Sequence, residues 1–317
     1  MVMLPEACTL RGRVAVARCF LPLAMASHLV AQNPPAAAID WWSEDSTRIA
    51  FVRAHGQPRT YPHVVIWSPS DSLDPRWLPS FEDSLAAGLD ALRALIGTPR
   101  PWQRIGNRPV VIILSPGRFI SHATGQDTVL IALVHVRKGW APFLHEAAHE
   151  LLAPPAPFSP YEYADTLVGE QKAAVFPFWL SEGLPDYLAQ SVVQTTGFRE
   201  GDVFEIGGLG KVDSTCRVRL SGHPRRGAIA ARIGGQGRLE ALYTTEREQV
   251  APTYYACSQS FTKYLASRIG LSAVVELMPA IPSGHWLAQL ETRAGAALPV
   301  LRREWLAALN IPDDFPP

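Results

Sequence analysis

The sequence predicts an α+β fold, with a small mixed sheet in the N-terminal part, a helix that carries the residues HEAAH, and a mainly helical C-terminal half. Two observations predict it. Short β-branched and apolar runs, separated by turn-rich stretches, occupy the chain up to residue 136. Apolar residues at helical spacing dominate the segments that can be assigned beyond residue 143.

The composition indicates a globular protein. The chain has 317 residues, of which 47% are hydrophobic and 18% charged, so it can bury the core of one large or two small domains. Lys plus Arg and Asp plus Glu both number 29, which gives a net charge of zero. Because there is no basic excess and no polybasic run, neither a nucleic-acid partner nor an anionic membrane surface is expected. The oligomeric state stays open.

Residues 1–31 have the pattern of a signal peptide. Arginines precede an apolar stretch, Cys19 to Val30, and cleavage is expected after Ala31 or Ala26. A short membrane anchor is the alternative, but the stretch is too short for a stable membrane span and Arg18 interrupts it. We therefore expect a secreted or periplasmic protein.

The elements of residues 32–153, the predicted α/β part, begin with two short strands, Arg48 to Arg53 and Pro62 to Trp67. The turn-rich stretch Ala54 to Thr60 separates them. Phe81 to Ile96 has leucines at helical spacing and ends at a glycine and a proline, so it is predicted to be an amphipathic helix.

Two further strands are predicted before the HEAAH helix. Val110 to Leu114 is a continuous β-branched run, which is typical of a strand buried on both faces. A loop, Ser115 to Gln126, leads to a second strand, Thr128 to Val136. Whether this second strand lies inside the sheet or at its edge is left open.

The HEAAH helix carries the residues that indicate a metal site with a general base. His145 and His149 are four residues apart, so both imidazoles project from one face and can reach a single ion. Glu146 lies about 100° round the helix, where it can touch a metal-bound water as a general base without ligating the metal. Two ordinary helix histidines are the alternative.

A second motif, WLSEGLPDYLA from Trp179 to Ala189, supplies the third ligand that a hydrolytic zinc site needs. Glu182 is the candidate ligand, and Asp186 could accept the free N–H of a ligating histidine. Pro185 is awkward beyond the first turn of a helix. If the helix begins near Ser181 or later, Pro185 falls in its opening turn. The helix is expected to run to about Thr195.

Together the two motifs resemble the gluzincins, the thermolysin-like zinc peptidases, and especially their peptidase-MA-like branch. Metzincins are excluded, because Leu152 and Pro155 stand where that family has its glycine and third histidine. The resemblance implies a gluzincin core with Zn²⁺ held by three ligands, and a sheet-edge strand before the helix that pairs with substrate. The matching residues are His145, Glu146, His149, Trp179, Leu180, Glu182, Gly183, Leu184, Asp186 and Tyr187.

Residues 154–317 form the predicted helical part. After the third-ligand helix the sequence turns irregular, with Gly-rich stretches that are expected to be loops and not phosphate cradles. Tyr254 to Ile269 returns to helical spacing, and resemblance to the gluzincin tyrosine helix places Tyr255 opposite the zinc. Tyr254 is the fallback, and a pair of core aromatics the alternative. Amphipathic segments close the chain at Ala273–Met278, Trp286–Leu290 and Leu298–Leu309.

Two cysteines, Cys216 and Cys257, remain once Cys8 and Cys19 are removed with the leader. In an oxidising compartment a disulfide between them is expected, and two buried thiols are the alternative.

These observations predict a secreted zinc metallopeptidase that acts on a peptide or protein substrate, with Glu146 as general base and Tyr255 as oxyanion donor. An endopeptidase is favoured over an aminopeptidase, because the acidic G-x-M-E-N-type anchor is absent upstream of the helix. The other hypothesis is a zinc-stabilised binding or scaffold protein that keeps the fold but cleaves nothing. The presence of Glu146 argues against it, because a structural zinc site needs no base.

Overall fold

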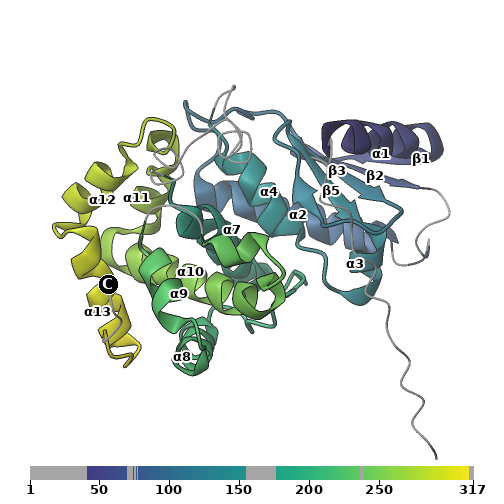
Figure 1. The fold of residues 1–317 in the computed structure, drawn as a ribbon. Coiled ribbons are helices and arrows are strands. Elements are labelled where there is room, and N and C mark those ends of the chain that lie inside the picture. The colour runs from purple at the N-terminus through teal and green to yellow at the C-terminus, as the bar shows by residue number, and fades with distance from the viewer. Residues whose placement is uncertain are drawn as a thin grey trace, which may run out of the picture. The chain divides into compact units, whose positions relative to one another are not determined.

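A five-stranded mixed sheet with helices on both faces forms the first part of the fold, and a group of helices follows it along the chain (Figure 1). The computed structural model describes residues 41–69, 74, 76, 78–154, 176–235 and 239–313. The predicted leader, its cleavage sites and Cys8 and Cys19 lie outside the described residues. The α+β class predicted from the sequence is confirmed.

The sheet has the strand order β1-β2-β3-β5-β4. The three inner strands are parallel, and a short antiparallel strand closes each edge. The inner strands are rich in β-branched residues and largely buried, as parallel strands with covered faces are. The bounds are β1 Gly56–Thr60, β2 Val64–Pro69, β3 Val110–Ser115, β4 His122–Ala123 and β5 Thr128–Ala132.

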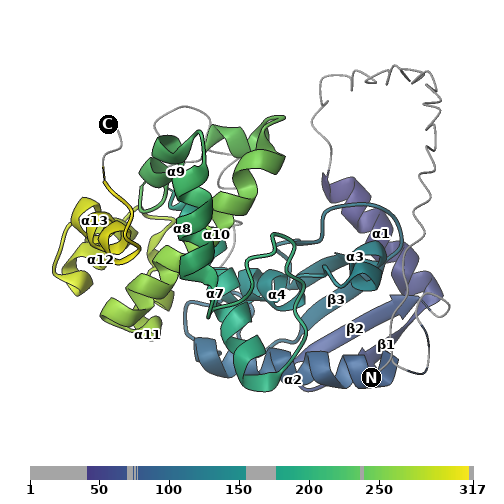
Figure 2. The ribbon, with the colours of Figure 1, turned by 90° about the horizontal axis from the view of Figure 1, so that it is seen from below.

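Helices α1 (Trp41–His55) and α2 (Leu78–Ile96) lie on opposite faces of the sheet (Figures 1 and 2). Val52 of α1 is fully buried against Ile113 and Leu130 in a small cluster of its own. Leu85, Leu89 and Leu92 of α2 belong instead to the main core, together with side chains from the other face of the strands. The predicted helix Phe81 to Ile96 is confirmed.

The sheet leads directly into the helix that carries HEAAH. Strand β5 is followed by α3 (Leu133–Lys138), which ends at Gly139 with a left-handed φ of 69°. Helix α4 (Phe143–Leu152) comes next, and every one of its residues is buried. The HEAAH residues thus lie on a buried helix between the sheet and the helical part, as predicted.

The helical part is built around α7 (Phe178–Thr196) and α10 (Arg247–Ile269), which pack against each other. At Gly183 the two backbones come so close that a Cβ atom would lie 2.4 Å from the carbonyl oxygen of Ser258. The remaining elements are α8 Val212–Gly222, α9 Arg226–Arg232, η1 Glu240–Tyr243, α11 Leu271–Val275, η2 Met278–Ala280, α12 Trp286–Ala294 and α13 Leu298–Ala308. The tail segments predicted at Trp286–Leu290 and Leu298–Leu309 form α12 and α13, whereas Ala273–Met278 is helical only to Val275. Among the described residues, no helix combines the length and hydropathy needed to span a membrane.

Two predictions for the N-terminal elements are wrong. Arg48 to Arg53 is not a strand but part of α1, where Arg48 pairs with Glu44 one turn earlier at 2.7 Å and Val52 packs on the sheet. The turn predicted at Ala54 to Thr60 contains β1. Pro58 is tolerated there because β1 is an edge strand.

The strand predicted from Thr128 to Val136 stops at Ala132, where α3 begins. It pairs with β3 on one side and with β4 on the other, so it lies inside the sheet. The edge is formed by β4, two residues of the predicted loop Ser115 to Gln126.

The third-ligand helix does not begin near Ser181 or later, the start that would have placed Pro185 in its opening turn. Helix α7 begins at Phe178, so Pro185 lies inside it and not in its first turn. Burial of one side of α7 against α4, α2 and α10 holds the helix together across the missing N–H. The stretch between α7 and α10, predicted to be irregular, contains α8 and α9. The domain limits 32–153 and 154–317 stay predictions.

Candidate metal centre

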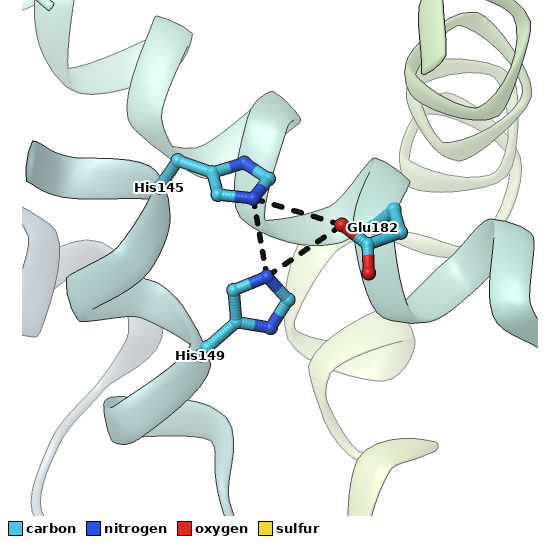
Figure 3. A group of neighbouring side chains, drawn as sticks. All are labelled: His145, His149 and Glu182. Carbon is cyan, nitrogen blue, oxygen red and sulfur yellow. Dashed lines mark hydrogen bonds and ion pairs between the residues drawn. The ribbon is translucent and has the colours of Figure 1, made fainter. Parts of the chain in front are cut away.

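Three side chains from two helices converge at the contact between α4 and α7 (Figure 3). The Nε2 atoms of His145 and His149 are 3.1 Å apart, and Oε2 of Glu182 lies 3.7 Å from each of them. Ligand atoms about 2.0 to 2.2 Å from a tetrahedral zinc lie about 3.3 to 3.6 Å from one another. The three atoms therefore fit a zinc ion with only small movements.

The burial of these ligands also fits a metal. All three side chains are buried, and buried titratable groups are costly unless they are paired or coordinate an ion. The two histidines come from successive turns of α4, and Glu182 comes from α7, which packs beside it. Among the described residues this is the group of histidine, cysteine and carboxylate side chains whose geometry could hold an ion. Two imidazoles and a carboxylate form a donor set typical of zinc.

Glu146 faces the edge of the sheet. Its Oε2 accepts a hydrogen bond from the backbone N–H of Ala123 in β4, at 2.9 Å. Burial raises the pKa of Glu146, and the charges of His145 and His149 oppose that rise. The carboxylate is thus fixed next to the ligand group without being one of its members.

Asp186 lies one turn beyond Glu182 on α7, and its Oδ1 is 2.7 Å from Nδ1 of His145. Burial lowers the pKa of His145, but the carboxylates of Asp186, Glu146 and Glu182, with Asp186 contributing most, together raise it to about 10. A hydrogen bond at Nδ1 leaves Nε2 as the atom that faces His149 and Glu182.

Tyr255 of α10 reaches the same group. Burial would raise the pKa of Glu182, but hydrogen bonding and charge from His149 and a hydrogen bond from the Tyr255 hydroxyl lower it below its usual value. Tyr254 is fully buried in the main core, and its ring centroid lies 6.2 Å from that of Tyr255. The structure thus brings Tyr255 to the ligands.

Two carboxylates that contact α4 or belong to it were not predicted from the sequence. Glu150 is buried and accepts hydrogen bonds from the backbone N–H groups of Gly125 and Asp127, at 2.6 and 2.9 Å, and pairs with Arg104. It holds the turn after β4 against the helix. A second glutamate, one helical turn after Glu146 and on the same helix face, was the sequence signal for this role.

The second missed carboxylate, Glu200, follows α7. Its Oε1 accepts hydrogen bonds from the backbone N–H groups of Leu144 and His145, at 2.8 and 2.9 Å. Burial of the carboxylate raises the pKa of Glu200 to about 8, although these hydrogen bonds oppose the rise. Its sequence neighbourhood is irregular and gave no signal.

Cys216 and Cys257 form a disulfide with an S–S distance of 2.07 Å, as predicted. The bond joins α8 to α10 and lies two residues beyond Tyr255.

No family model matches the chain, and no curated protein matches its sequence. Among solved structures, the chain is similar to a mutant M1 zinc metallopeptidase from Deinococcus radiodurans bound to a Tyr-Ser-Ala substrate. The TM-score is 0.46 and the sequence identity 17%, and the match covers 83% of this chain and 54% of that one. The chain thus spans about half of the length of that peptidase. A likeness of this degree assigns no function.

Proposed function

We propose that the protein is an exported zinc metallopeptidase that hydrolyses peptide bonds in a peptide or protein substrate. The observation that carries the proposal is the buried group His145, His149 and Glu182, with the carboxylate of Glu146 beside it. Structural zinc sites are closed by four protein ligands, whereas catalytic sites have three and keep one position open. The three donors found among the described residues, next to a base, match a catalytic site.

Zinc at this group would polarise the scissile carbonyl and lower the pKa of a bound water towards neutrality. Glu146 accepts the proton of the attacking water on its carboxylate and passes it to the leaving amine. The N–H of Ala123 holds that carboxylate in one orientation. Asp186 keeps His145 in the tautomer that presents Nε2. Tyr255 donates a hydrogen bond to the developing oxyanion.

Export is supported by the disulfide, because such bonds form and persist in oxidising compartments. We infer that residues 1–31 direct it.

Endopeptidase activity is our proposal over aminopeptidase activity. An aminopeptidase needs a carboxylate to bind the free amino terminus of its substrate. The two aspartates that flank the edge strand are already engaged: Asp45 with His122 at 2.8 Å, and Asp127 with Arg108. Strand β4 is an edge strand, to which an extended peptide can add by backbone hydrogen bonds.

A library of internally quenched peptides tests the function, with each peptide made with a free and with a blocked amino terminus. We expect cleavage of both forms, loss of cleavage with a chelator, and recovery on addition of zinc. Glu146→Gln is the matched control, because it keeps the shape of the side chain but cannot act as a base. Cleavage of the free form alone would show an aminopeptidase. Zinc-dependent stability without any cleavage would favour the scaffold hypothesis.

A further inference from the structure

Residues 198–207 connect α7 to α8 (Figure 2). They contact residues of the candidate metal centre at two separate places. The first contact is Glu200, whose carboxylate accepts the N–H groups of Leu144 and His145. The first N–H groups of a helix have no acceptor within the helix, and no side-chain hydrogen bond comes from the N-cap residue Pro142. Glu200 therefore fixes the backbone of a candidate zinc ligand from a distant part of the chain.

The neighbouring residue brings the segment close to the start of α4. The N–H of Gly201 donates to the carbonyl oxygen of Ala141 at 3.0 Å. A Cβ atom on Gly201 would lie 2.2 Å from the carbonyl carbon of Trp140, so only glycine fits this approach. The position of Glu200 beneath the helix depends on this close contact.

The second contact is Phe204, whose ring packs on that of Tyr255. The ring centroids are 4.6 Å apart, and the ring planes are inclined by 34°. The hydroxyl at the edge of the same Tyr255 ring makes a hydrogen bond with Glu182. Phe204 thus limits the rotation of Tyr255.

Further hydrogen bonds hold the segment in place. Asp202 accepts the N–H groups of Ile206 and Gly207 on its two carboxylate oxygens, at 2.8 and 2.7 Å. The carbonyl oxygen of Ile206 accepts the hydroxyl of Thr215 at 2.9 Å. Thr215 precedes Cys216, so the disulfide connects this anchor to the helix of Tyr255.

We propose that residues 198–207 position both halves of the reaction centre, with Glu200 orienting the zinc ligand His145 and Phe204 orienting the oxyanion donor Tyr255. The inference rests on the proposed function, which makes His145 a zinc ligand and Tyr255 the oxyanion donor. Glu200 and Phe204 are positioning residues, because they act through the residues they contact.

The Glu200 contact is tested by zinc affinity, measured by competition with a chromophoric chelator on the full chain. We expect Glu200→Ala to weaken zinc binding about 10- to 100-fold, which is usual for residues that orient metal ligands. Glu200→Gln should recover most of the affinity, because one amide oxygen can accept both N–H groups as Oε1 does. The control is Val52→Ala, which truncates the separate core on the other face of the sheet. It should lower the melting temperature and leave zinc affinity unchanged.

The Phe204 contact is tested without activity. The chain has eight tyrosines, so 3-fluorotyrosine labelling gives eight fluorine resonances, and Tyr255→Phe assigns that of Tyr255. Phe204→Ala should shift this resonance and leave zinc affinity unchanged. Val203→Ala, next to it and half exposed, should leave both the resonance and the zinc affinity unchanged. In turnover, Phe204→Ala should lower kcat about 10- to 100-fold with KM unchanged, as small misplacements of catalytic groups do.

The proposal is overturned if Glu200→Ala binds zinc as tightly as the wild type, or if Phe204→Ala leaves the Tyr255 resonance in place. A wild-type chain that binds no zinc and cleaves no peptide contradicts the proposed function instead. The fluorine resonance then still decides whether Phe204 holds Tyr255.

Discussion

Replacing Tyr255 by Phe removes one oxygen at the metal centre and keeps the ring. The packing against Phe204, with ring centroids 4.6 Å apart, should survive. Two hydrogen bonds are lost, and they differ in when they form. The bond to Glu182 exists before the reaction, so its loss does not by itself raise the barrier. The bond to the oxyanion forms only as the carbonyl becomes tetrahedral, and its loss should cost about 2.7 to 4 kcal/mol, which is 100- to 1,000-fold in kcat.

The assay is steady-state hydrolysis of a quenched peptide by zinc-loaded protein, with the zinc content measured on the same sample. We expect kcat to fall by this factor while KM and zinc content stay near the wild-type values. Tyr254→Phe is the matched control, because the Tyr254 side chain is fully buried in the core. If Tyr254→Phe is the inactive variant, the roles of the two tyrosines are exchanged. If both variants stay active, neither phenol takes part.

Three further outcomes follow from the geometry. Glu146→Gln should keep zinc and lose turnover, measured by metal analysis and peptide cleavage; loss of zinc would make Glu146 a ligand. Asp186→Asn should weaken zinc binding about 10- to 100-fold in chelator competition, and unchanged affinity would remove its orienting role. The Cys216–Cys257 disulfide joins residues that are 41 apart in the sequence. Reducing it should lower the free energy of unfolding by about 4 kcal/mol in a denaturant titration. Alkylation of the two thiols serves as the control that the bond is open. A protein equally stable when reduced contradicts this account of the bond.

The elements that were predicted correctly are those determined by a local pattern of residues. Phe81 to Ile96 has a strong apolar period and Val110 to Leu114 a continuous β-branched run, and both form the expected elements. Arg48 to Arg53 looked like a strand because of its apolar residues, but the ion pair of Arg48 with Glu44 and the burial of Val52 belong to a helix. Tertiary packing also determines the extent of α7, which continues through Pro185.

The residues of the candidate site also divide into those that a local sequence pattern indicates and those that it does not. His145, Glu146 and His149 lie on one short helix, so their spacing alone indicated that they could act together. Glu182 was found through a second motif. Glu200 and Ala123 act through backbone hydrogen bonds that span many residues, and such bonds impose no pattern on the sequence around them.

The central claim is that His145, His149 and Glu182 hold a zinc ion. The most direct test is the zinc-to-protein ratio of the purified chain, measured beside that of Glu182→Ala after identical dialysis. The account predicts one zinc per chain in the wild type and most of it lost in Glu182→Ala, because a zinc site of three protein ligands is reduced to two. A wild-type chain without zinc, or full occupancy in Glu182→Ala, would contradict it.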